Sequence, residues 1–241
     1  MEITIILIIG IIFISAFVRS TFGFGDALIA MPLLAMVIPL NQATPFVGLC
    51  AICYSSLILI KEWRNVKFKD VIILIITAFI GIPIGIYFLK GNYDQLMKLV
   101  LGFFIALFSL FNIFKPQLFH LKNDKTAFLF GFIGGILGGA YNTNGPPVVI
   151  YSALRKWDPK YFRATMQGFF LPTGLMIAIG HAVAGLWTKP VLIHFLYVLP
   201  GVVIAVILGG ILNRRIKKEA FNKYIFVILL GLSVFLIYQN I

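Results

Sequence analysis

The sequence predicts an all-α integral membrane protein, a single transmembrane domain over residues 1–241 built from two inverted repeats of about five helical segments each. The first observation is composition: the chain is 61% hydrophobic and 12% charged, whereas a soluble domain is about half apolar and about one quarter charged. The second is the alternation of long apolar runs with short polar loops. The third is a glycine-bearing polar break that recurs at a similar place in each half.

The apolar runs define the expected segments. A membrane-spanning helix needs about 20 mostly apolar residues, so the chain has room for roughly eight to ten. We place the first repeat at about 1–114 and the second at about 126–241. The expected segments are 3–18, 27–40, 44–60, 71–89 and 96–114, then 126–140, 147–154, 164–187, 190–212 and 223–238. The first pair in each repeat is short, broken or re-entrant, because runs of about 10 to 14 residues do not span a bilayer.

Weak internal similarity indicates that the two halves are repeats. The stretch 42–46 resembles the stretch 162–166 through a shared Ala-Thr pair, and near that register the break at 22–24 aligns with 143–145. Each half then has an odd number of crossings, whether its broken pair crosses or re-enters, and an odd unit repeated in tandem is inverted in the bilayer. Inverted repeats with broken helices and a site near the midplane are the pattern of secondary transporters.

The basic residues indicate the orientation. Of the 20 basic residues, 17 fall on the side of the membrane that the chain reaches after its first segment, and the exceptions are Lys90, Lys98 and Lys189. The positive-inside rule makes this side cytoplasmic and leaves both termini outside the cell. The same rule accounts for the net charge of +12, so we expect the lipid bilayer as a partner and no nucleic acid.

The two polar breaks are candidate halves of a substrate-binding site. Non-helical backbone at membrane depth is tolerated only where it is buried in protein or lines a wet cavity. A helix starting near Gly145 would offer free N–H groups to an anion, while glycines in the first break let backbone approach a ligand closely. The candidate substrate-binding residues are Asn142, Thr143, Asn144, Gly145, Gly23, Phe24, Gly25 and Arg19. Alternatively, the breaks are helix caps and hinges of a packed bundle, with Thr143 or Asn144 as the cap.

Ionisable residues inside apolar segments are functional hypotheses by default. Arg19 could pair with an anionic substrate, could only neutralise Asp26, or could snorkel to the cytoplasmic face. Asp26 and His181 are the candidates for carrying a coupling proton. The alternative for His181 is a hydrogen bond to a neighbouring helix. Gln167 and Thr173, near His181 in the sequence, could line the cavity.

Two stretches resemble the signatures of the sulfite exporter TauE/SafE family. The first is 22–34, which begins Phe22-Gly23-Phe24-Gly25-Asp26, and the second is 138–151, followed by Phe162-Arg163-Ala164-Thr165. The resemblance covers nearly the whole chain. The sequence departs from the family at Asn142 and Asn144, where glycine is usual, and at Asp26, where glycine or alanine is common. The resemblance implies multi-pass transport of small sulfur oxyanions, such as sulfite, sulfoacetate and other sulfonates.

We therefore predict a secondary transporter that moves a small anion across the cytoplasmic membrane by alternating access, with the two breaks meeting near the midplane. The resemblance implies a sulfur oxyanion or organosulfonate as the substrate, and a proton is the expected coupling ion. The alternatives are a passive anion channel and a permease for a different small anion or a metal ion. A homodimer is left open.

The sequence gives no reason to expect an enzyme, a cofactor or a resident metal. The apolar segments hold no clustered His, Asp and Glu or Ser and His set. Cys50 and Cys53 would share one helix face, as a soft-metal or redox site requires. The simpler interpretation is that these small thiols pack well between membrane helices.

Overall fold

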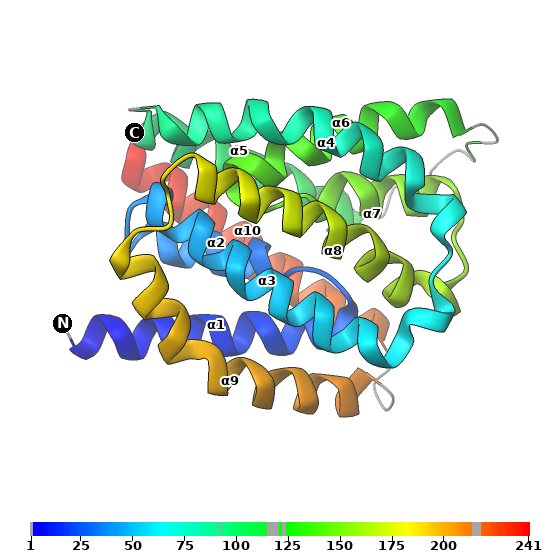
Figure 1. Cartoon of the computed structure of the whole chain (residues 1–241), viewed down its shortest axis with the longest axis horizontal. Coiled ribbons are helices and arrows are strands. Elements are labelled where there is room, and N and C mark those ends of the chain that lie inside the picture. Colours follow the sequence, from blue (N-terminus) through cyan, green and yellow to red (C-terminus); the bar gives the residue numbers. More distant parts are fainter. Residues whose placement is uncertain (1, 92, 115–120, 122–123, 214–217) are drawn as a thin grey trace.

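The computed structural model describes residues 2–91, 93–114, 121, 124–213 and 218–241, and over these ranges the chain is helical with no strand. Figure 1 shows the helices running along the long axis of one bundle. The first half contains α1 (Glu2–Phe22), α2 (Asp26–Ala35), α3 (Leu40–Glu62), α4 (Phe68–Lys90) and α5 (Asp94–Phe114). The second half contains α6 (Ala127–Tyr141), α7 (Gly145–Leu154), α8 (Pro159–Val183), α9 (Lys189–Asn213) and α10 (Lys218–Asn240). The predicted fold class, an all-α membrane protein, is confirmed.

Helix lengths separate membrane-spanning helices from short ones. In the described part of the chain, α1, α3, α4, α5, α8 and α9 are long and apolar enough to cross a membrane. By contrast, α2 and α7 have 10 residues each and α6 has 15. The expected segment 3–18 is longer than predicted, because α1 continues through Arg19, Ser20 and Thr21. These polar side chains stay in the helix because each finds a partner inside the protein.

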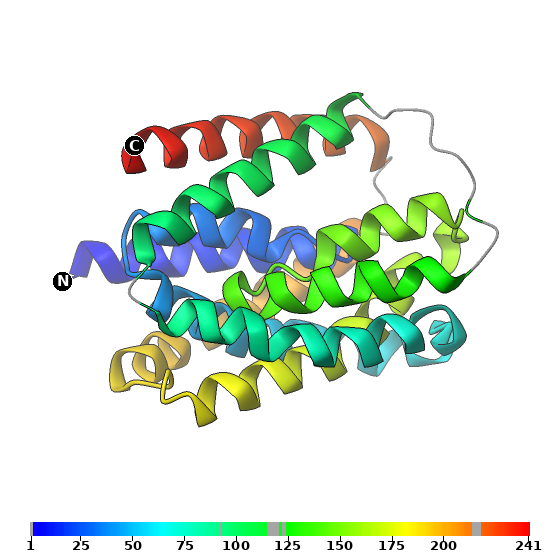
Figure 2. The ribbon, with the colours of Figure 1, turned by 90° about the horizontal axis from the view of Figure 1, so that it is seen from above.

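The two broken pairs enter the bundle from opposite ends. Figures 1 and 2 show both termini at one end, where the pair α1–α2 starts and to which it returns. The pair α6–α7 starts at the other end and also returns to its own side. Each break therefore lies inside the bundle, and α3, α4 and α5 connect the two ends between the pairs.

Contacts between the two halves are reciprocal. The fourth helix of each half packs on the first helix of the other, as α4 on α6 and α9 on α1. Likewise, α3 contacts α9 and α4 contacts α8, while α3 packs on α8 and α5 on α10. If each helix of the first half corresponds to the helix five places later, exchanging the halves reproduces these contacts. A two-fold axis between inverted repeats would give this pattern.

The α4–α6 contact is a seam of glycines. A Cβ atom on Gly81 would lie 2.2 Å from the Phe132 carbonyl oxygen, and one on Gly85 would lie 2.1 Å from that of Ile136. From the other side, a Cβ atom on Gly135 would lie 2.2 Å from the Ala78 oxygen. Only hydrogen fits at these positions, so the two backbones touch directly, as they do in other membrane helix pairs with small residues at the interface.

Candidate functional site

The first break joins α1 to α2 through Gly23, Phe24 and Gly25, and the backbone conformation requires glycine at the first and third of these positions. Gly23 and Gly25 have φ angles of 91° and 100°, a region that residues with a side chain rarely adopt. This turn brings the end of α1 beside the start of α2. As a result, Nη1 of Arg19 donates hydrogen bonds to both carboxylate oxygens of Asp26, each at 2.8 Å.

Arg19 is buried, and both of its Nη atoms donate hydrogen bonds. It is 3% exposed, which excludes the snorkelling alternative in this structure. Nη2 donates to the hydroxyl of Ser55 at 2.5 Å and to Oε1 of Gln167 at 3.3 Å. The guanidinium lies over the ring of Phe170, 4.4 Å from its centroid, whereas Nε is buried without a hydrogen-bond partner. A cation therefore sits inside the bundle with one carboxylate as its counter-ion and one unused N–H.

Such an ion pair is a poor device for stability alone. Two charges taken out of water lose solvation that their attraction only partly restores, and an apolar pair of similar volume is often as stable. A guanidinium fork, however, binds planar or tetrahedral oxyanions through paired N–H groups. In this structure the Asp26 carboxylate occupies the Nη1 side of that fork.

The second break has the geometry of a helix end, and Asn144 stands at the predicted cap position, but its side chain does not cap α7. Asn142 adopts a left-handed conformation with φ 55° at the end of α6. Instead, the Asn144 side chain points to α8, where its Nδ2 donates to the Thr173 hydroxyl at 3.0 Å. The Thr143 hydroxyl donates a hydrogen bond to the Leu137 carbonyl on α6 at 3.4 Å. The side chains of this break therefore serve contacts with α6 and α8.

His181 adds an unpaired atom next to this break. Its Nε2 lies 3.0 Å from the Gly139 carbonyl oxygen, and because a carbonyl only accepts, Nε2 must carry the hydrogen. Nδ1 is buried without a partner. A Cβ atom on Gly48 would lie 3.7 Å from this Nδ1 and 3.6 Å from Oδ1 of Asn142, so both polar atoms face the space that Gly48 leaves open.

Gly48→Ala tests whether this open space is used. The added methyl group would make only ordinary contacts, so we expect normal folding, while water would be excluded from between Asn142 and His181. Transport, the function that the sequence predicts, should fall about ten-fold, the equivalent of one lost hydrogen bond. The control is Gly174→Ala, whose methyl group would lie 3.7 Å from an Ile52 carbon. Equal transport by the two variants would show that the space beside Gly48 has no role.

The two breaks share one aromatic neighbour. Phe170 carries the Arg19 guanidinium on its ring, and its Cζ lies 3.2 Å from where a Cβ atom on Gly145 would be. Gly23 and Phe24, predicted to contact a ligand, face protein here: Gln167 donates to the Gly23 carbonyl at 2.7 Å, and Phe24 packs edge-on against Phe162. Phe170 thus stands between Arg19 and the start of α7.

Sequence reasoning found part of this environment. Gln167 and Thr173 were expected to line the cavity, and both are buried beside the two breaks. Ser55 and Phe170 were not predicted. A hydroxyl within the apolar run of α3 was a signal for Ser55, but phenylalanine is too common in this chain for Phe170 to be noticed.

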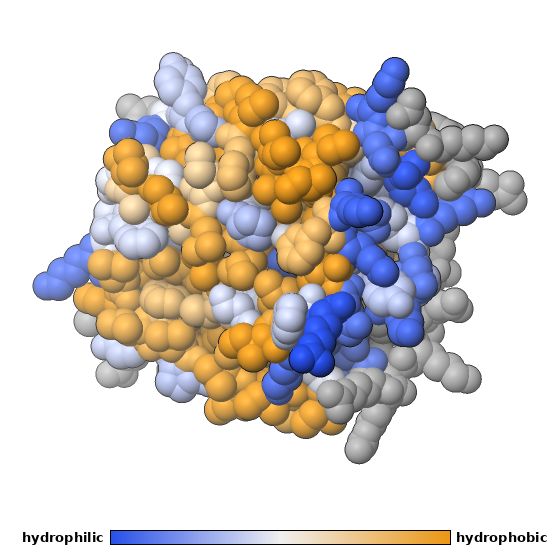
Figure 3. Space-filling view, turned by 45° about the vertical axis from the view of Figure 1, so that its right-hand side comes forward, coloured by the Kyte–Doolittle hydropathy of each residue, from blue (hydrophilic) through white to orange (hydrophobic). Residues whose placement is uncertain are grey.

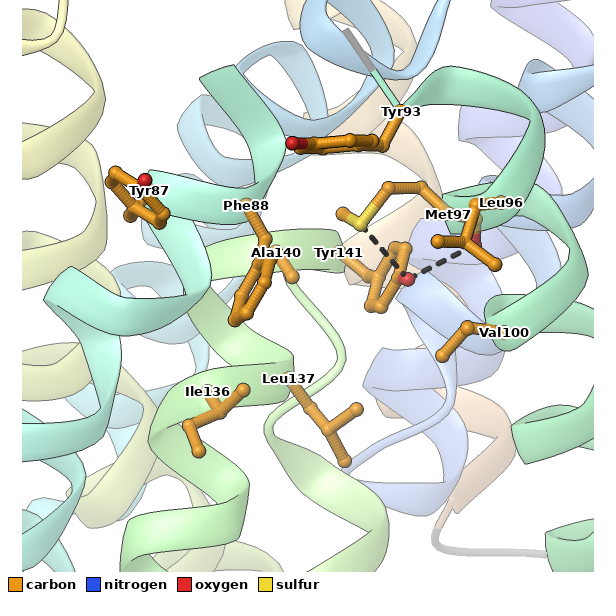
Figure 4. A pocket seen from close by; sticks show the side chains of 10 residues that line it. All are labelled: Tyr87, Phe88, Tyr93, Leu96, Met97, Val100, Ile136, Leu137, Ala140 and Tyr141. Atoms are coloured by element: carbon orange, nitrogen blue, oxygen red, sulfur yellow. Dashed lines mark hydrogen bonds between the residues drawn. The ribbon is translucent and has the colours of Figure 1, made fainter. Parts of the chain in front are cut away.

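A different cavity opens near the end of the bundle that holds the termini. Figure 4 shows it between α4, α5 and α6, with Phe88, Met97 and Leu137 on its walls. Its volume is about 540 Å³. The Tyr141 hydroxyl at its edge already donates to the Met97 carbonyl at 2.9 Å. This apolar hollow offers little to an anion, although Tyr141 adjoins the second break.

The fold and the site define a multi-pass helical membrane protein with an ion-paired arginine buried at a helix break. The chain belongs to the sulfite exporter TauE/SafE family, whose model matches residues 7–236, so the predicted resemblance is confirmed. It is similar to the probable sulfite/organosulfonate exporter TauE of Cupriavidus necator, with 23% identity over 221 residues that cover 89% of this chain and 86% of that protein. No solved structure matches the chain significantly. The protein is therefore a membrane transporter and not an enzyme.

Proposed function

We propose that the protein is a secondary transporter that carries a small sulfur oxyanion or organosulfonate, such as sulfite or sulfoacetate, across the cell membrane by alternating access. The observation that carries this proposal is the buried Arg19, held by Asp26 at the first helix break. The family and the name of the Cupriavidus relative support the substrate class and export as the direction. Homodimer formation stays a prediction.

The orientation follows from the basic loops. Figure 3 shows hydrophilic residues gathered at one end of the molecule beside a wide apolar surface. This is the end opposite the termini, where the loops between α3 and α4 and between α7 and α8 lie. The described basic residues in these loops include Arg64, Lys67, Arg155 and Lys156. By the positive-inside rule this end is cytoplasmic and the termini are outside.

The anion would bind by replacing Asp26 on Arg19. Sulfite and sulfonate groups carry several oxygens that accept hydrogen bonds from a guanidinium as a carboxylate does. The displaced Asp26 would then be an unpaired charge in an apolar environment, which is costly unless it is neutralised. A proton would neutralise it, so the anion and a proton would cross together. A pH-sensitive dye in the same vesicles as the transport assay tests this; anion flux without proton movement would contradict it.

Alternating access needs a site that can open to each side of the membrane in turn. The broken pairs enter from opposite ends, and the reciprocal packing of the halves fits two inverted repeats at about 1–114 and 126–241. Inverted repeats of this kind expose a central site to each side in turn. Arg19 and Asp26, each 3% exposed, are closed off from both ends in this conformation.

The test is counterflow of labelled sulfite in proteoliposomes, which a passive channel does not support. Arg19→Gln combined with Asp26→Asn removes both charges while keeping similar shapes. Because both charges are removed together, neither is left buried without a counter-ion, so we expect this double variant to fold and to show no counterflow. The control is Lys98→Gln with Asp94→Asn, which removes a partly exposed ion pair on α5. Counterflow by the Arg19/Asp26 variant at the wild-type rate would overturn the assignment of Arg19.

A further inference from the structure

A second polar cavity lies at the basic end of the bundle. It has a volume of about 290 Å³ and is enclosed by the ends of α1, α3, α8 and α9. The polar and charged residues in its lining are Ser20, Lys61, Glu62, Arg163 and Asn213. None of these five residues is among the predicted site residues. The cavity is roughly ten times the volume that one water occupies in the liquid, so a small hydrated anion fits.

Arg163 is the central cation of this cavity. Its Nη1 forms an ion pair with the Glu62 carboxylate, and its Nη2 lies 3.5 Å from the Ser20 hydroxyl oxygen. Ser20 donates its own hydrogen to the Val206 carbonyl at 2.6 Å, so towards Arg163 it can only accept. The Arg163 side chain is also packed against the first break, since a Cβ atom on Gly23 would lie 3.1 Å from its Cγ.

Two residues that line the cavity, Ser20 and Arg163, are close in the chain to Arg19 and to its partner Gln167. Ser20 follows Arg19 directly in α1. On α8, Gln167 lies one turn after Arg163, so both side chains are on the same face. Gln167 accepts a hydrogen bond from Arg19 and donates one to the Gly23 carbonyl. Two arginine–carboxylate pairs therefore follow each other from the basic end inwards, first Arg163–Glu62 and then Arg19–Asp26.

The two carboxylates differ in how easily they are displaced. The Glu62 side chain is 27% exposed, whereas that of Asp26 is 5% exposed. A carboxylate that water can reach keeps part of its solvation when it leaves its partner, so its displacement costs less than that of a buried one. The exposed Lys61 at the rim adds a second positive charge that attracts anions.

We propose that this cavity is an entry vestibule in which Arg163 binds a small sulfur oxyanion or sulfonate in place of Glu62 before the anion reaches Arg19. The inference rests on the proposed function, because only a transported anion has to pass from the vestibule to the buried site. Glu62 acts as a competitor that keeps the vestibule closed when the anion is scarce. The vestibule is therefore a weaker, more accessible anion site in series with the buried one.

Trp63 provides a local reporter for this site. It directly follows Glu62 and is 59% exposed, and the other two tryptophans, Trp157 and Trp187, can be replaced by phenylalanine. In the purified full-length protein, titration with sulfite or methanesulfonate should give a saturable change in Trp63 fluorescence. Arg163→Gln should weaken this binding about ten-fold or more, the value of a lost charge-assisted hydrogen bond. Glu62→Gln should tighten it about three-fold or more, because a competing charge is removed.

The matched control is Lys69→Gln, which removes a positive charge at the start of α4 without touching the cavity. It should bind as the wild type does. Wild-type affinity in Arg163→Gln would overturn the vestibule proposal. If Arg163→Gln does not fold, wild-type affinity in Glu62→Gln would overturn it. Counterflow of labelled sulfite by the wild type is measured in parallel. If the wild type does not transport sulfite at all, the proposed function is wrong. If it transports sulfite but the affinity measured by Trp63 fluorescence is the same in Arg163→Gln and Glu62→Gln as in the wild type, only the vestibule proposal is wrong.

Discussion

Asp26→Asn is expected to lower the free energy of unfolding by about 3 to 5 kcal/mol, because it leaves the buried Arg19 charge without its counter-ion. The hydrogen bonds from Nη1 to the two Asp26 oxygens, each at 2.8 Å, would be replaced by at most one bond to the neutral amide oxygen. Ser55 and Gln167 would stay as neutral partners. Thermal unfolding of the purified variant in anion-poor buffer measures the loss.

An anion should reverse this loss if Arg19 is the binding site. Methanesulfonate at 100 times its dissociation constant would add about 2.7 kcal/mol to the stability of the variant. The wild type should gain less at the same concentration, because there the anion has to displace Asp26. The control is Asp158→Asn, since Asp158 caps α8 at an exposed position and asparagine caps about equally well. Destabilisation of Asp26→Asn that no anion relieves would show that the pair is only structural.

The same variant identifies the proton carrier. Without a carboxylate at position 26, transport should lose its dependence on a pH gradient, and tight binding of the anion to an uncontested Arg19 should slow its release. Unchanged dependence on the pH gradient would instead assign the proton to His181. His181 Nδ1 is a buried titratable atom beside the second break, and it has no partner among the described residues.

Local sequence predicted which segments are helical but not where all of them end. The apolar run that stops at Val18 suggested an early end of α1, yet the helix continues to Phe22. The reason lies far away in the chain, because Ser20 donates to Val206. The bounds of α8 also differ from the predicted segment 164–187, because the helix runs from Pro159 to Val183. Its polar start is helical because the Asp158 side chain accepts a hydrogen bond from the Lys160 N–H at 2.8 Å.

The candidate site was predictable to the extent that its partners are close in sequence. Arg19 and Asp26 lie seven residues apart, and their pairing was among the alternatives. Ser55 and Gln167 come from α3 and α8, and no local pattern connects them to Arg19. The same holds for Asn144: its sequence position suggests a helix cap, but its side chain finds Thr173 after α8 folds back.

Gly85→Ala is expected to disrupt the contact between α4 and α6. The new Cβ atom would lie 2.1 Å from the Ile136 carbonyl oxygen and 2.7 Å from the Ala140 nitrogen. Both are backbone atoms, so no side chain can rotate away, and the helices must separate. Overpacking of this kind costs about 3 kcal/mol or more. Thermal unfolding in detergent should therefore show a large loss of stability from the addition of a single methyl group.

Glycines that face outwards provide the comparison. Gly10 on α1 and Gly231 on α10 have no atom within 4 Å of an added Cβ atom. Alanine should stabilise these helices slightly, by up to about 1 kcal/mol each, because glycine is the poorer helix former. The difference between Gly85→Ala and these controls isolates the seam from helix propensity. Equal stability of all three variants would mean that α4 and α6 are further apart in the membrane than in this structure.

The seam also determines which parts can move. Since α6 carries the second break and touches the α4 backbone directly, a motion that separates α4 from α6 would expose backbone carbonyls that no side chain shields. The α4–α6 pair should therefore move as one body, carrying Asn142 and Asn144 with it. Cysteines introduced at Thr77 and Gly131 would be too close for a disulfide without distortion. A Cβ atom on Gly131 would lie 2.0 Å from the Thr77 hydroxyl oxygen. Cross-linking nearer the lipid-facing edge of the seam should leave sulfite counterflow intact, and loss of counterflow would show that the seam itself opens during transport.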